Sequence, residues 1–147
     1  MQQRVVSLGL PGWINVGGDF YPQELPDDWR LAYYAQCFEC VWLPRVTWTP
    51  VAPAEIRVWL DEVPEHFRFL LEGFAGDTLP FLDAQLLLAA PSPDDGGVLL
   101  RPGREPDLRA LGREIPRYVE AGTPVYLLAE TTLQAGPLQI LRDLLGY

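Results

Sequence analysis

Apolar residues along the chain follow two alternating spacings. Short continuous runs, such as 5–10 and 67–71, have the length and the β-branched or aromatic content of buried strands. Between these runs, apolar residues recur at i, i+3, i+4 and i+7, which is the period of an amphipathic helix. The two clearest helical stripes are Leu31, Tyr34, Ala35, Phe38 and Ile56, Trp59, Leu60, Val63.

This pattern predicts strands at residues 5–10, 40–46, 67–71, 98–101 and 124–129. We expect one helix capped by Asp27 or Asp28, a second from 53 to 63, and a third around 108–119. A final helix is expected to open at Gly136-Pro137, with Leu138, Leu141, Leu144 and Leu145 on its apolar stripe. The segment from Thr78 to Ser92 is apolar almost all round at 81–90, so periodicity leaves helix and strand both open.

Regular alternation of strands and helices is typical of a parallel sheet covered by helices. No linker, charge block or low-complexity tract interrupts the sequence. We therefore predict one α/β domain that spans residues 1–147.

The composition excludes several kinds of chemistry. All 11 basic residues are arginine, so the chain cannot form a Walker-type phosphate loop or a lysine Schiff base. His66 is the single histidine, which rules out a multi-histidine metal site. The formal net charge of −9 and the pI near 4.4 argue against nucleic-acid binding. We predict no metal and no cofactor.

The sequence also indicates a compartment. No apolar run is long enough for a membrane helix, and the run at 5–10 is too short for a signal peptide. Two cysteines do not make a secreted disulfide framework. We expect a cytoplasmic protein without membrane contact.

Cys37 and Cys40 have the spacing of a redox pair or half a zinc site. They fall at the end of a predicted helix, whereas a reactive cysteine pair lies at a helix start, where the thiol pKa is lowered. We interpret them as free, buried or half-buried thiols. His66 lies in a predicted helix-to-strand turn and is interpreted as an exposed turn residue.

A family resemblance appears in the first half of the chain. The run Asp19-Phe20-Tyr21-Pro22, the segment 31–38 and the phrase Val63-Pro64-Glu65-His66-Phe67-Arg68-Phe69 resemble the YecE-like family. That family comprises bacterial proteins of unassigned function with a TIM-barrel-like fold. A weaker similarity covers residues 97–145, where the last two strands of the barrel would fall.

This resemblance implies a shortened member that lacks the middle barrel units, because an eight-unit barrel requires about 250 residues. The implied fold is an open, partial barrel-like sheet of about five mostly parallel strands, in the order 3-2-1-5-4. Its two uncovered edges must be paired or shielded.

The departures from the family pattern fall at the carboxyl ends of the strands, where barrel-like folds place their chemistry. Trp42 stands where the family has a glutamate, Trp48 where it has a tyrosine, and Glu72 where it has a lysine. Glu130 replaces an asparagine. The resemblance therefore implies a retained scaffold that has lost its site.

Three hypotheses for function remain. The first is a non-catalytic domain that acts through protein contacts, as a homodimer or with another protein, with Trp42 and Trp48 on the contact surface or filling the former pocket. The second is a small hydrolase or lyase that uses Glu72 and Glu130, with or without a divalent cation. The third is an acidic regulator of a basic protein partner.

Overall fold

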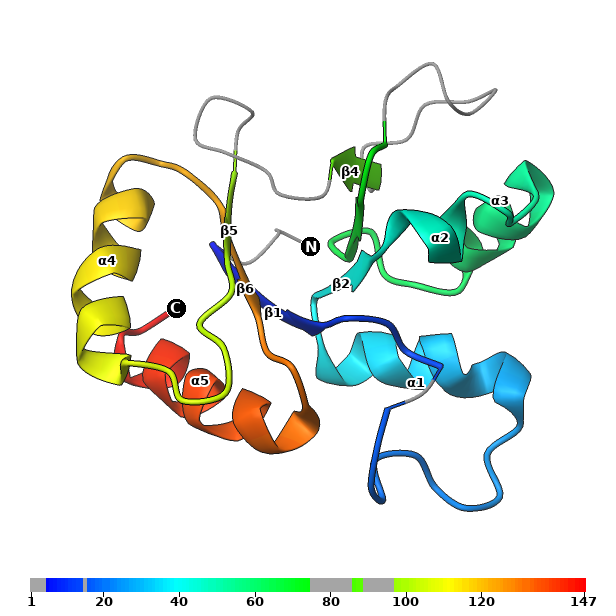
Figure 1. Cartoon of the computed structure of the whole chain (residues 1–147), viewed down its shortest axis with the longest axis horizontal. Helices are drawn as coiled ribbons and strands as arrows, with labels where there is room; N and C mark the ends of the chain where they lie inside the picture. The colour runs from blue at the N-terminus through cyan, green and yellow to red at the C-terminus, as the bar shows by residue number, and fades with distance from the viewer. Residues whose placement is uncertain (1–4, 15, 75–85, 89–96) are drawn as a thin grey trace.

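The computed structural model describes residues 5–14, 16–74, 86–88 and 97–147. Its centre is a six-stranded sheet in which every pairing is parallel, in the order β4-β3-β2-β1-β6-β5. The strands are β1 (Val6–Leu10), β2 (Cys40–Leu43), β3 (Arg68–Leu71), β4 (Leu86–Leu88), β5 (Val98–Leu100) and β6 (Val125–Leu128). The sheet curls into a half-barrel, with helices outside it (Figure 1).

The predicted fold class and strand order are confirmed. The five expected strands correspond to β1, β2, β3, β5 and β6, and they lie in the expected order 3-2-1-5-4. β4 is an additional strand, beyond β3. It lies within the segment 78–92 that the sequence left open, and the remainder of that segment lies outside the described residues.

Five α-helices and one 3-10 turn lie between or after the described strands. They are η1 (Asp27–Trp29), α1 (Arg30–Cys37), α2 (Arg45–Trp48), α3 (Pro53–Asp61), α4 (Leu108–Glu120) and α5 (Thr132–Leu144). α4 and α5 pack together beside β6 and β1. α1, α2 and α3 lie toward the other end of the strand order, beyond β1 (Figure 1).

Several predicted boundaries were wrong, each for a local reason. β2 ends at Leu43 because Pro44 follows, and the expected last residues of that strand instead form α2. Neither Asp27 nor Asp28 caps α1 with its side chain, because both belong to η1.

α5 also begins earlier than expected. The Thr131 side chain accepts a hydrogen bond from the Gln134 amide at 3.3 Å, which caps the helix at its first turn. Pro137 consequently lies inside α5 instead of opening it.

Each face of the sheet is buried, as expected for parallel strands. Alternate residues of β1, Val6, Leu8 and Leu10, face the helices and join the main core. Side chains on the other face of the sheet form a second cluster. In it Cys40, Leu70 and Tyr126 are buried, and Trp42 and Leu99 are half-buried.

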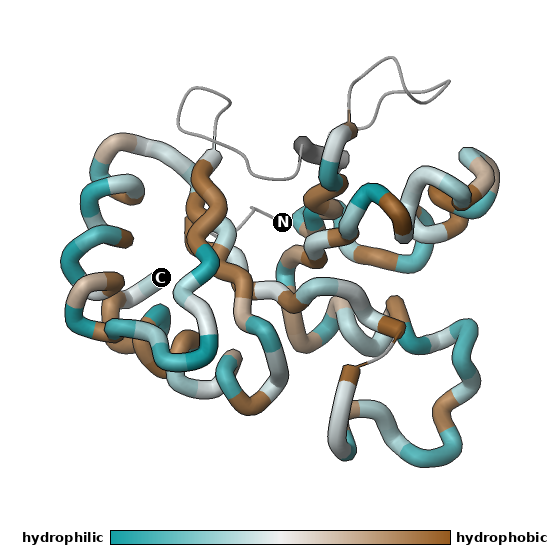
Figure 2. The backbone as a smooth tube through the Cα atoms, viewed as in Figure 1, coloured by the Kyte–Doolittle hydropathy of each residue, from teal (hydrophilic) through white to brown (hydrophobic). Residues whose placement is uncertain are grey.

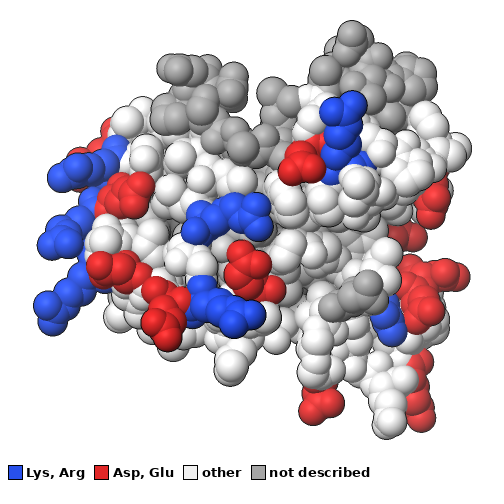
Figure 3. Space-filling model, in the orientation of Figure 1, with Lys and Arg blue, Asp and Glu red and all other residues white. Residues whose placement is uncertain are grey.

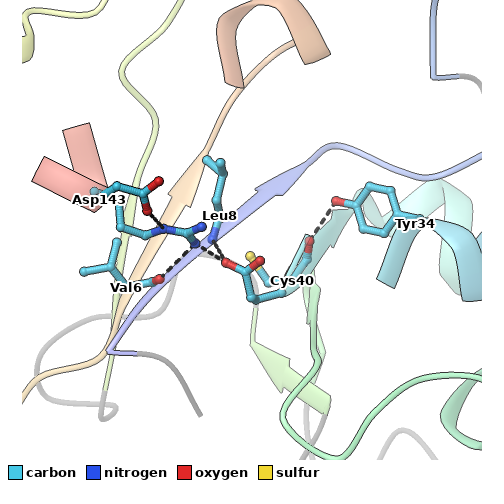
Figure 4. Close-up of polar contacts among 7 residues, drawn as sticks. Val6, Leu8, Tyr34, Cys40 and Asp143 are labelled. Carbon is cyan, nitrogen blue, oxygen red and sulfur yellow. Dashed lines mark hydrogen bonds and ion pairs between the residues drawn. The ribbon is translucent and has the colours of Figure 1, made fainter. Parts of the chain in front are cut away.

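A side chain of α1 links β1 to β2, and its hydrogen bond to Cys40 of β2 is drawn in Figure 4. The Tyr34 hydroxyl accepts a hydrogen bond from the Leu10 amide at 2.7 Å and donates one to the Cys40 carbonyl, also at 2.7 Å. One side chain from α1 therefore bridges the two strands. At Gly9 an added Cβ would lie 2.2 Å from the Cys40 carbonyl oxygen, so this approach requires glycine.

A buried ion pair holds the end of α5 against the same two strands (Figure 4). Arg142 is buried and forms a salt bridge with Glu39, and it also donates to the Val6 carbonyl at 3.4 Å. The Glu39 carboxylate additionally accepts from the Leu8 amide at 3.2 Å. Residues 103 positions apart in sequence are thereby joined at the amino end of the sheet.

Candidate functional site

Glu72 follows β3 at the carboxyl edge of the sheet, where the sequence placed it. Its carboxylate accepts a hydrogen bond from the Arg45 amide at 3.0 Å, so it satisfies a free N–H at the start of α2. Its backbone carbonyl accepts from the Trp48 indole Nε1 at 2.7 Å. Glu72 therefore fixes α2 above the end of β3.

Glu130 follows β6 and has different neighbours. Its carboxylate lies 3.7 Å from the Arg101 guanidinium, which follows β5. That guanidinium lies 4.6 Å from the centroid of the Trp42 ring, in the geometry of a cation–π contact. Glu130, Arg101 and Trp42 thus form a connected series across the sheet edge.

The two glutamates are separated by three strand spacings, because β2 and β1 lie between β3 and β6. Each carboxylate also has its own partner, the Arg45 amide for Glu72 and the Arg101 guanidinium for Glu130. A shared cation requires carboxylate oxygens within a few ångströms of one another. In the described part of the chain, no group of three metal-ligating side chains is present.

Trp48 was expected on a contact surface or in the former pocket. Its side chain is 2 % exposed, and its ring packs edge-on against Phe74 at 5.9 Å. Trp48 therefore lies in the core and not on the exposed surface. Trp42 is half-buried beneath Arg101.

The cysteines are both free thiols. Cys37 is exposed rather than half-buried, whereas Cys40 lies in the core. Burial raises the pKa of both thiols, and the nearby Glu39 carboxylate raises that of Cys40 further. Both remain protonated at neutral pH, unlike the thiolates of redox pairs.

His66 lies just before β3, at the amino edge of the sheet, and is half-buried instead of exposed. It is remote from the strand ends that carry Glu72 and Glu130.

Trp29, directly before α1, is mostly exposed. It belongs to η1, before the apolar stripe of α1 begins.

A cleft of about 700 Å³ lies between the start of α1 and α3. The loop after β1 and the start of α2 complete its walls. The sequence did not predict this cleft, because its lining comes from four separate stretches of the chain.

The outer face of α5 is a second feature that the sequence did not predict. Leu133, Ile140 and Leu144 are 85 %, 62 % and 81 % exposed, and Pro137 between them is exposed as well. We name these four residues the α5 stripe. Leu144, expected on the packed side of this helix, instead points to solvent. Apolar residues recur along α5 as well as on the central strands (Figure 2).

Charge is distributed unevenly over the surface (Figure 3). Exposed arginines at 109, 113 and 117 line the edge formed by α4, while acidic side chains gather at the opposite edge, by α1 and α3. In contrast, Asp143 is the one exposed charged residue within α5. No helix in the described part of the chain is long and apolar enough to cross a membrane.

These features define an open parallel α/β half-barrel in which the strand-end residues Glu72 and Glu130 contact neighbouring groups of the protein. Residues 7–78 match the sequence family described as protein of unknown function DUF72, which is the family also called YecE-like. The resemblance found in the first half of the sequence is therefore confirmed for that segment.

One solved structure extends the comparison to the whole fold. A crystal structure of a DUF72 family protein from Thermotoga maritima is 11 % identical to this chain and superposes with a TM-score of 0.53. The match covers 98 % of this chain and 100 % of that chain, and at this identity it shows the fold alone. No curated protein matches the sequence.

Proposed function

We propose that the chain is a divergent, shortened YecE-like domain throughout its length, and that it acts without catalysis by forming a homodimer through the α5 stripe. The proposal of a shortened barrel is supported by the pairing of β1 with both β2 and β6, because this joins the first and last strands as in a closed barrel.

The residues at the strand ends support a role without catalysis. Glu72 supports α2 and Glu130 faces Arg101, so both carboxylates already have partners at the edge where barrel chemistry is expected. Both cysteine thiols have a raised pKa and are poor nucleophiles.

The observation that carries the dimer is the α5 stripe. Its members follow one another at intervals of four, three and four residues, which keeps them on one face of a helix. The same spacing lets two helices pack along a common seam. Large apolar residues exposed together on one helix face mark an interaction surface.

A second copy meets the least charge repulsion at this face. With a net charge of −9, two copies repel one another at most orientations. The α5 face carries little charge, so this repulsion is least where the apolar residues are exposed. Depletion of charge is typical of the centre of protein interfaces.

The affinity of this dimer follows from the number of aliphatic side chains that it buries. Complete burial of a large aliphatic side chain contributes about 1.5–3 kcal/mol, and two copies supply six such side chains. Association opposes this with about 4–15 kcal/mol of lost motion. The midpoints of these ranges leave about 4 kcal/mol and their more favourable part about 8 kcal/mol, which correspond to dissociation constants from about 1 mM to about 1 μM.

Sedimentation velocity over about 1–200 μM protein tests the proposal. We expect wild type to pass from monomer to dimer, and Ile140→Glu to remain monomeric. Val46→Glu is the matched control, because Val46 on α2 is likewise an exposed aliphatic residue, at 81 % against 62 % for Ile140, and the change adds the same charge. A wild-type monomer throughout this range contradicts the proposal, as does equal dimerisation of wild type and Ile140→Glu.

A further inference from the structure

The cleft between α1 and α3 is apolar at its base. Trp13 and Trp59 meet edge-on there with ring centroids 4.9 Å apart, and Leu31 and Leu43 also line the cleft. Its volume of about 700 Å³ lies in the range of small-molecule sites. A ligand with an apolar body would replace water against these side chains.

One basic residue lines the cleft, and its charge is already balanced. The Arg30 guanidinium lies 3.3 Å from the Asp27 carboxylate and donates to the Ile14 carbonyl at 2.7 Å. It also lies 5.1 Å from the centroid of the Tyr21 ring. Arg30 is therefore held at the wall of the cleft by several partners.

Three further carboxylates line the cleft without such a partner. Asp28, Glu55 and Glu62 form no ion pair in the described part of the chain. Burial raises the pKa of Glu62, and the nearby charge of Asp28 raises it further. Glu62 directly follows α3 and Asp28 lies in η1, so the two carboxylates come from both sides of the cleft and repel one another.

We propose that this cleft binds a small organic cation with an apolar body. The cation relieves the repulsion between Asp28 and Glu62, and its apolar body covers the Trp13 and Trp59 side chains that line the cleft. A neutral molecule of the same shape gains the apolar contacts alone. An anion of that shape is repelled.

Three probes of matched shape separate these contributions in isothermal titration calorimetry: 2-phenylethylammonium, 2-phenylethanol and 3-phenylpropionate. We expect the ammonium to bind at least about tenfold more tightly than the alcohol, with no binding of the carboxylate at about 10 mM. The advantage of the ammonium should shrink at high salt, because exposed charges are screened.

Variants locate the site. Asp28→Asn combined with Glu62→Gln should weaken the ammonium about tenfold and leave the alcohol unchanged. Both positions are exposed, so the fold tolerates the change. Glu114→Gln combined with Glu120→Gln removes the same charge from α4 and should leave binding intact. Equal affinity for all three probes overturns the proposal, as do absent binding of the ammonium and equal losses in the two double variants.

Discussion

Removal of one buried oxygen atom tests how β1 and β2 are joined. The Tyr34 hydroxyl connects the Leu10 amide to the Cys40 carbonyl, with both heavy-atom distances at 2.7 Å. Tyr34→Phe deletes that oxygen while the ring remains, so no large cavity forms in the core. Two buried backbone groups then lose their partner.

An unpaired buried donor or acceptor lowers stability by about 1–3 kcal/mol. Two such groups give an expected loss of about 2–4 kcal/mol after local relaxation, a large part of the 5–15 kcal/mol typical of a domain. The melting temperature should fall by roughly 5–15 °C. Urea unfolding followed by circular dichroism measures the loss directly.

Tyr33→Phe is the control, because Tyr33 lies on the same helix and its hydroxyl forms no hydrogen bond in the described part of the chain. We expect a change below about 0.5 kcal/mol for that variant. Equal stability losses for the two variants would refute the bridging role of Tyr34.

The same hydroxyl gives a dependence on pH. Burial raises the pKa of Tyr34 well above its usual 10.0, and the neighbouring Cys40 adds to the effect. The folded state therefore retains the proton that the unfolded state loses, so this contribution is complete below pH 10 and is lost as the pH rises further. The stability difference between wild type and Tyr34→Phe should accordingly narrow above pH 10.

Three further changes probe the same region. Arg142→Met should lower stability by about 3–5 kcal/mol in urea unfolding, because it leaves Glu39 charged and half-buried, and adding Glu39→Gln should recover at least half of that loss. With Ellman's reagent, Cys37 should react in the native protein and Cys40 only after unfolding; two fast-reacting thiols would contradict the burial of Cys40. Gly9→Ala should destabilise the fold by more than about 3 kcal/mol, because its Cβ overlaps backbone atoms of β2, and a change under about 1 kcal/mol would show that the strands separate easily.

The sheet was predictable because its signals are local. Each of the five expected strands is a short apolar run, and right-handed crossovers between parallel strands left few arrangements for them. β4 was not assigned because its sequence, Leu86–Leu88, has no alternating residue to distinguish a strand from a buried helix.

The contacts that fix the site depend on residues far apart in the chain. Glu39 and Arg142 are separated by 103 positions, and neither has a local pattern that identifies the other. The lining of the cleft comes from four stretches, so no motif spacing described it. In α5 the packed residues and the α5 stripe are both apolar, so the hydrophobic pattern does not show which side of the helix is buried.

The strand-end substitutions are better understood together than one by one. Where the family resemblance implies separate polar groups around a site, Trp48 binds the Glu72 carbonyl, and the Glu72 carboxylate in turn supports α2, the helix that carries Trp48. The two hydrogen bonds support each other, because the Glu72 carboxylate accepts from the first residue of α2 and the indole on the last residue of α2 donates to the Glu72 backbone. Both side chains therefore have a structural reason to be present that needs no ligand.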